Sequence, residues 1–147
     1  GAMFFMLTSE RNEKSYAAVR DIKTFFRPEG INEIEEQIRS FLQRNNLSAN
    51  DVDLVLAGYN GDPEFDIIYL NLENSLFEKT AVGWFKHLTG DYDTASAFAL
   101  TLAAKIISGE QIPEVILKKG SVKNPKTVLI YNQFRNVNHS LILLTDG

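Results

Sequence analysis

Lys86, Asp91 and Asp93 stand directly ahead of an apolar stretch with helical spacing, in the segment KHLTGDYDTASAFALTLAAK. Carboxylates at the start of a helix are stabilised by its dipole, and Lys86 is placed to form an ion pair with Asp91. Together with Asp62 and Asp66, Asp91 could instead supply a general base for hydrolysis or acyl transfer. That chemistry requires an apolar pocket that raises the pKa of the base.

The rest of the composition excludes several other chemistries. The chain has no cysteine, and neither of its two histidines, His87 and His139, has a partner at metal-ligand spacing. The sequence therefore predicts no metal, no cofactor and no thiol nucleophile, and we expect surface or hydrogen-bonded histidines. A formal charge of −4 argues against a nucleic-acid partner.

Length and composition also limit the number of domains and indicate the cellular location of the protein. At 147 residues, with 44% apolar residues, the chain has the size of one globular domain, which we assign to residues 3–147. Gly1 and Ala2 have the look of a cloning scar. The opening GAMFFML is too short for a signal peptide and no apolar run reaches the length of a membrane span, so we expect a cytoplasmic protein.

Hydrophobic periodicity predicts the elements that must position these side chains. The expected strands are residues 4–8, 15–26, 52–58, 80–85, 126–134 and 139–146, and the expected helices are residues 31–45, 62–77 and 93–108. The order is β-β-α-β-α-β-α-β-β. Strands that alternate with helices favour an α/β fold, here a mixed, mostly parallel five-stranded sheet with helices on both faces.

The third helix has almost no polar face, because only Ser96, Thr101 and Lys105 interrupt its apolar residues. A helix that is apolar on all sides is normally enclosed on all sides. One interpretation is a small-residue helix docked on a sheet, with a weakly apolar outer face. The other is a helix that lies between its own sheet and a second layer absent from this chain. The residues expected at that interface are Phe98, Ala99, Leu102 and Ala103.

Four segments carry a resemblance to a known family. They are FFMLTSERNEKSYAAVRDIKTF, LSANDVDLVLAGYNGDPEFD, KHLTGDYDTASAF and YNQFRNVNHSLILL. In this order they resemble successive motifs of the C-terminal half of a β-ketoacyl synthase, an enzyme with the thiolase fold. In that family the C-terminal half packs against an N-terminal half of similar topology, which implies that the third helix belongs to a central buried layer.

The same resemblance implies that the catalytic positions are degenerate. Gly58 stands at the first family histidine, Asn60 at a threonine and Asp91 at the second histidine, whereas the family lysine is retained as Lys86. Family histidines donate hydrogen bonds to developing negative charge, which glycine cannot do and an ionised aspartate opposes. A competent condensation site is therefore not expected.

The closing motif departs from the family as well. Asn138 keeps the family asparagine and Phe134 the aromatic residue, so both are candidates for substrate binding. The paired glycines of the family have become Arg135 and Asn136, which puts the acyl-binding geometry in doubt.

The leading interpretation is a catalytically silent, chain-length-factor-like subunit that assists a ketosynthase in fatty-acid, polyketide or aryl-polyene synthesis. Its partner would be a ketosynthase-type protein, a separate N-terminal half or a second copy in a homodimer, with an acyl carrier protein as a further partner. The alternatives are an enzyme of altered acyl-transfer or hydrolytic chemistry that uses Asp91, and an acyl-binding or scaffold module without catalysis. The resemblance leaves open whether the chain is a fragment or a natural half-protein.

Overall fold

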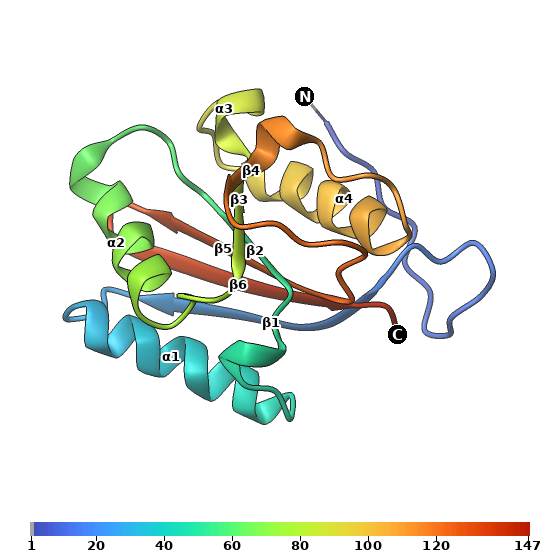
Figure 1. Ribbon diagram of the computed structural model, residues 1–147, viewed down its shortest axis with the longest axis horizontal. Helices are drawn as coiled ribbons and strands as arrows, with labels where there is room; N and C mark the ends of the chain where they lie inside the picture. The colour runs from blue at the N-terminus through green and yellow to red at the C-terminus, as the bar shows by residue number, and fades with distance from the viewer. Residues whose placement is uncertain (1) are drawn as a thin grey trace.

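A computed structural model describes residues 2–147, which form a mixed six-stranded sheet (Figure 1). The strand order across the sheet is β1-β6-β5-β2-β3-β4. The strands are β1 (Ala18–Phe26), β2 (Leu54–Ala57), β3 (Ala81–Trp84), β4 (Leu117–Lys119), β5 (Thr127–Phe134) and β6 (Asn138–Thr145). The pairs β2/β3 and β2/β5 are parallel, and the pairs β1/β6, β5/β6 and β3/β4 are antiparallel.

Helices cover both faces of the sheet, as the sequence predicted (Figure 1). On one face lie α1 (Ile31–Arg44) and α2 (Pro63–Asn74), and on the other lies α4 (Ala95–Ile107), preceded by the single turn α3 (Lys86–Thr89). The buried side of α1 follows the predicted helical spacing. Asp62 caps α2 by accepting a hydrogen bond from the Glu64 N–H at 3.0 Å, with Pro63 in the first turn.

Two predictions about the sheet are wrong. Residues 4–8 form no strand: Phe4 is 96% exposed and the segment has no ladder partner among residues 2–147, because a short apolar run does not by itself supply a neighbouring strand. The sequence reading also missed β4, whose three residues are too few to show a period. The sheet has six strands, whereas a five-stranded sheet was expected. Three of its five neighbouring pairs are antiparallel, so the sheet is not mostly parallel.

The orientation of α4 corrects part of the expected interface. Ala99 and Ala103 are fully buried in the core of the chain itself, where α4 packs on β5 and β6. They are therefore not available to another chain. Phe98 and Leu102 remain partly exposed beside this core, and they stay candidates for an interface.

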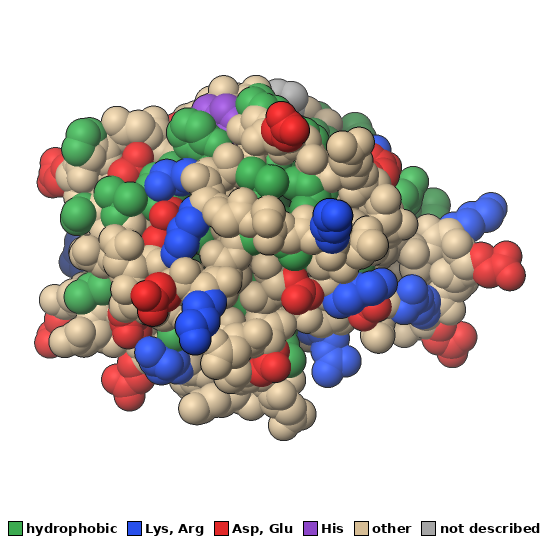
Figure 2. All heavy atoms as spheres, in the orientation of Figure 1, with side chains coloured by type: hydrophobic (Ala, Val, Ile, Leu, Met, Phe, Trp, Pro, Cys, Tyr) green, Lys and Arg blue, Asp and Glu red, His purple; other side chains and the backbone are tan. Residues whose placement is uncertain are grey.

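The face of the sheet under α4 is only partly covered. Ile142 packs in the core with α4, and its cross-strand partner on β1 is Ile22, so the two share one face. Ile22 is 58% exposed, and Phe26, four residues further along the same face, is 60% exposed. Figure 2 shows hydrophobic side chains at the surface on the side of the molecule that carries α4. An apolar sheet face thus extends beyond the helix that covers it.

Candidate functional site

The site lies at the carboxyl ends of β2, β3 and β5, which meet at one edge of the sheet because these strands are parallel. The loop after β2 supplies Gly58 and Asn60, and the segment after β3 supplies Lys86 and Asp91. Crevices at this edge of α/β sheets are common ligand sites. The four degenerate positions from the sequence thus come from two neighbouring connections.

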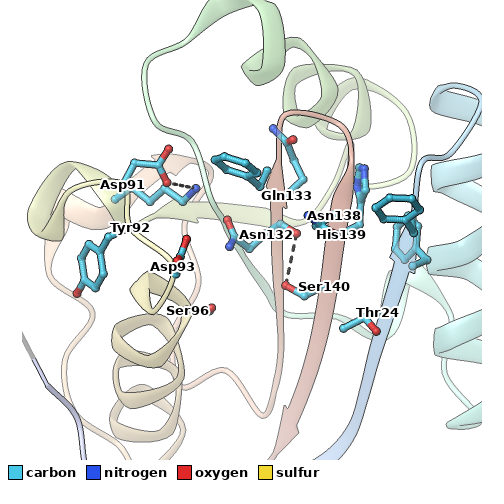
Figure 3. Close-up of a pocket in the computed structure, with 14 residues that line it drawn as sticks. Thr24, Asp91, Tyr92, Asp93, Ser96, Asn132, Gln133, Asn138, His139 and Ser140 are labelled. Atoms are coloured by element: carbon cyan, nitrogen blue, oxygen red, sulfur yellow. Dashed lines mark hydrogen bonds and ion pairs between the residues drawn. The ribbon is translucent and has the colours of Figure 1, made fainter.

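A cavity of about 620 Å³, which we call the groove, opens at this edge (Figure 3). Its size falls within the range of small-molecule sites, roughly 300–1,000 Å³. Figure 3 shows Asp91, Tyr92, Asp93 and Ser96 on one side of the groove and residues of the β5–β6 hairpin on the other. The lining residues include Thr24, Phe26, Lys86, Asn132, Phe134, Asn138 and Ser140.

The predicted ion pair between Lys86 and Asp91 is confirmed, with Nζ and Oδ1 2.7 Å apart. The Lys86 side chain is only 3% exposed. The second carboxylate oxygen of Asp91 accepts a hydrogen bond from Nδ2 of Asn60 at 2.7 Å. Both oxygens of Asp91 are therefore occupied by residues of the chain itself.

This environment keeps Asp91 ionised. Partial burial raises the pKa of Asp91, but the hydrogen bonds from Lys86 and Asn60 and the charge of Lys86 outweigh burial and lower the pKa below its ordinary value. A general base for neutral pH needs the opposite shift. The geometry therefore counts against the use of Asp91 as a base.

The loop after β2 is held by its own hydrogen bonds. Asp66 accepts from the backbone N–H groups of Asn60 at 3.1 Å and Gly61 at 2.9 Å, and Oδ1 of Asn60 accepts from the Asp62 N–H at 3.0 Å. With the bond to Asp91, the amide of Asn60 uses both its donor and its acceptor side. These polar groups stabilise the loop and leave little capacity to bind a reacting group.

The space around Gly58, where the resemblance in sequence implied that a histidine is replaced, is filled by neighbouring side chains. A Cβ atom on Gly58 would lie 2.3 Å from Oδ1 of Asn132 and 2.9 Å from the hydroxyl of Tyr69. Both distances are shorter than real Cβ contacts, so no side chain fits at position 58 while Asn132 keeps its place. Oδ1 of Asn132 is itself buried, without a hydrogen-bond partner among residues 2–147.

Two residues of the β5–β6 hairpin, Phe134 and Asn138, were expected to bind substrate, and this role stays a prediction. Asn138 and Phe134 both line the groove, and the guanidinium of Arg135 lies 5.5 Å from the centre of the Phe134 ring. Arg135 and Asn136 both have φ of 51°. Both residues thus have the left-handed backbone that glycine adopts most easily, and they carry side chains there.

The two histidines have different surroundings. His139 is buried and shares a 2.8 Å hydrogen bond between its Nδ1 and the Tyr131 hydroxyl, and burial lowers its pKa. His87 is exposed, with Nε2 3.0 Å from the Val115 carbonyl oxygen. Among residues 2–147, no group of histidine, aspartate and glutamate side chains could hold a metal ion. Within the same described range, no helix is both long and apolar enough to cross a membrane.

Replacing Lys86 by Met is expected to lower the free energy of unfolding by about 1–2 kcal/mol, because Asp91 would lose its buried partner. The cost stays below that of a fully buried pair because the Asp91 side chain is 36% exposed. The stabilisation is complete above pH 3.8, the ordinary pKa, and is lost as the pH falls through the lowered folded pKa.

Denaturant unfolding and an NMR titration of the Asp91 carboxyl measure both effects, and the variant should show a higher Asp91 pKa. Lys105→Met is the matched control, since it breaks an exposed pair with Glu110. An unchanged Asp91 pKa in the Lys86 variant would contradict the role given to the ion pair.

Sequence reasoning missed Asn132, whose effect on Gly58 depends on the contact of two strands. One signal was present in the sequence. The residues of β5 that face α4 are Val128 and Ile130, and Asn132 continues that face as a polar residue at the end of the strand. A polar side chain in this place suits a site at the sheet edge. The contributions of Thr24, Phe26, Tyr92 and Ser96 to the groove came only from the structure.

No protein-family model and no curated protein sequence matches the chain. Solved structures do match it. One is a chain of AntDE:AntF (apo), a type II PKS acyl-carrier protein in complex with its ketosynthase bound to the hexaketide, with a TM-score of 0.73, 18% identity and coverage of 90% of this chain. Another is 3-oxoacyl-[acyl-carrier-protein] synthase III from Aquifex aeolicus VF5, with a TM-score of 0.54, 16% identity and 91% coverage.

The chain spans only 39% and 46% of the lengths of these two structures. At such low identity the similarity establishes the fold and nothing about the chemistry. The α/β fold of this chain, with its mixed six-stranded sheet, is thus thiolase-like, as the resemblance in sequence implied.

Proposed function

We propose that the chain is a ketosynthase-like subunit without a condensation site of its own, which supports a ketosynthase-type partner in fatty-acid, polyketide or aryl-polyene synthesis. The observation that carries this proposal is the state of Asp91. An ionised carboxylate, held by Lys86 and Asn60, stands where the chemistry needs a hydrogen-bond donor to a developing anion.

The filled space at Gly58 supports the same conclusion. A histidine there would require Asn132 to move, so the second donor is absent and its space is occupied in this structure. Removal of one oxyanion donor typically costs a factor of about 100–1,000 in rate. With both donors missing, we expect no measurable condensation by the chain alone.

The surface around α4 supports a partner layer. The outer side of α4 carries the small residues Ala97, Thr101 and Ala104, and the exposed Lys105 follows one turn after Thr101. The sheet face beside α4 leaves Ile22 and Phe26 exposed. Either a ketosynthase-type chain or a second copy of this chain would cover both surfaces, and the AntDE:AntF structure shows that one neighbour of this fold is part of a complex.

The proposal is tested by thioester condensation, measured for the chain alone and in a mixture with a ketosynthase that has its own cysteine and histidines. We expect no turnover by the chain alone, and turnover in the mixture that is the same for wild type and Asp91→Ala. Turnover by the chain alone that is lost in Asp91→Ala would overturn the proposal in favour of an enzyme of altered chemistry.

An acyl-binding module is the second candidate, because the groove is large enough for a ligand. Tight binding of an acyl thioester by a chain that associates with no ketosynthase and with no second copy would favour this function. Asn138→Ala and Phe134→Ala should then weaken the binding, since both side chains line the groove.

A further inference from the structure

The free edge of β1 is a potential pairing site for another strand. β1 is one of the two outermost strands of the sheet, and it is nine residues long. Its exposed side chains include Val19, Ile22 and Phe26. Long apolar edge strands pair readily with other chains unless the edge is blocked.

The outward backbone groups at the middle of β1 are already occupied. The N–H of Ile22 donates to Oδ1 of Asp21 at 2.8 Å, and the carbonyl oxygen of Ile22 accepts from Nη2 of Arg44 at 3.3 Å. A second strand would need these two groups to form its ladder. Side chains of the same chain thus form the hydrogen bonds that the Ile22 backbone would otherwise offer to another strand.

These contacts belong to a cluster that we call the edge clamp, formed by Asp21, Arg44 and Asn45. Oδ2 of Asp21 accepts from Nε of Arg44 at 2.5 Å and from Nδ2 of Asn45 at 2.7 Å. The Arg44 guanidinium also lies 4.9 Å from the centre of the buried Phe41 ring, which fixes it against α1. The end of α1 is thereby fastened to the edge of the sheet.

An irregularity in β1 reinforces the clamp. The register of β1 against β6 shifts between Val19 and Asp21, which marks a bulge directly before the clamped residues. Bulges and charged side chains are the usual means by which edge strands avoid pairing. The clamp and the bulge therefore meet within four residues of one edge.

We propose that the edge clamp keeps β1 from pairing with β1 of a second copy of this chain. An antiparallel pair centred on Ile22 would place Asp21 of each copy opposite Lys23 of the other, which gives two opposite-charge pairs. A shift by one residue in either direction removes both pairs. The strand is thus self-complementary in one register, and it is the register that the clamp blocks. This inference does not depend on the proposed function, which concerns the face of the sheet rather than its edge.

The test uses single-cysteine variants, because the chain has no cysteine of its own. Ile22→Cys places one thiol at the centre of the proposed pair, where it would face its own copy at a distance that a disulfide can span. Under mild oxidation, Arg44→Ala/Ile22→Cys is expected to form at least ten times more disulfide-linked dimer than Ile22→Cys alone. Arg39→Ala/Ile22→Cys is the matched control, since Arg39 of the same helix pairs with Glu35 and not with a residue of the clamp.

A second cysteine position tests the register and separates edge pairing from association through α4. Thr24 shares the face of Ile22 but would lie opposite Arg20 in the proposed pair, so Arg44→Ala/Thr24→Cys should not link. Equal linking with and without Arg44, or linking at both positions, would overturn the proposal. Absence of linking in Arg44→Ala/Ile22→Cys would also overturn it when the circular dichroism spectrum is unchanged. Arg44→Gln, which keeps a helix-forming side chain, replaces Arg44→Ala if that variant unfolds.

Discussion

Replacing Thr101 by Arg is expected to weaken the association of the chain with its partner about 100-fold, while the chain itself stays folded. Thr101 lies two residues from the fully buried Ala99, about 200° around α4, so it faces away from the sheet. In the assembly an arginine there would be buried without a counter-charge, at a cost of roughly 3 kcal/mol. Arginine is also a better helix former than threonine, which favours retained folding.

Light scattering after size exclusion measures this effect for the chain alone, over a range of concentrations. If the wild type is a monomer, the same measurement is made in a mixture with a ketosynthase. Asn71→Arg is the matched control, because it adds the same charge to an exposed position of α2 on the opposite face of the sheet. Equal assembly of wild type and Thr101→Arg would remove α4 from the interface.

Ala99→Arg gives the complementary result. Ala99 is fully buried against the chain's own sheet, so a charged side chain there should unfold the chain rather than dissociate an intact one. Thermal unfolding and circular dichroism separate the two outcomes. A well-folded Ala99→Arg variant that fails only in association would show that α4 is rotated relative to the present structure.

Replacing Gly58 by Ala is expected to lower the free energy of unfolding by about 2 kcal/mol, the usual cost of an inserted methyl group in a packed site. The added Cβ would lie 2.3 Å from Oδ1 of Asn132, and the hydroxyl of Tyr69 closes the other side at 2.9 Å. Because Asn132 occupies this space, Gly58→His alone is expected to destabilise the chain further and to restore no condensation.

A double-mutant cycle tests the cause. Asn132→Ala should cost little by itself, since the Oδ1 atom that it removes has no hydrogen-bond partner. In Gly58→Ala/Asn132→Ala the steric conflict with Asn132 is gone, so most of the loss should be recovered, with a coupling of about 1–2 kcal/mol. Additive effects in denaturant unfolding would show that the two positions do not compete for the same space.

The sequence alone determined most of the local structure. The helical spacing of apolar residues in α1, the Asp62-Pro63 start of α2 and the continuous apolar runs of β2 and β3 each led to the right element. These elements form because their short-range pattern matches the core that they bury. The ion pair of Lys86 with Asp91 could also be predicted from the sequence, because a short helical turn and a glycine bring the two residues together.

The sequence did not determine which side of α4 meets the sheet. A helix with apolar residues on every side has no amphipathic stripe to set its rotation, so Ala99 and Ala103 could not be distinguished from the outward residues. Two predictions failed for a related reason: the sequence pattern gave no sign of the antiparallel strand β4, and it indicated a strand at residues 4–8 that does not form. Strand pairing depends on a neighbour distant in sequence, which a local pattern does not specify.

Only the tertiary structure decided what the degenerate positions do. The resemblance implied that Gly58 and Asp91 stand where two histidines are expected. The contact between Asn132 and the space at Gly58 links residues more than 70 positions apart in the sequence, so no local pattern could predict it. The edge clamp likewise joins Asp21 to Arg44 across two elements. The periodicity of a sequence indicates which side of an element is buried. The contacts of single polar side chains depend instead on how whole elements pack against one another. The hydrogen bonds and steric contacts of this site therefore became visible only in the tertiary structure.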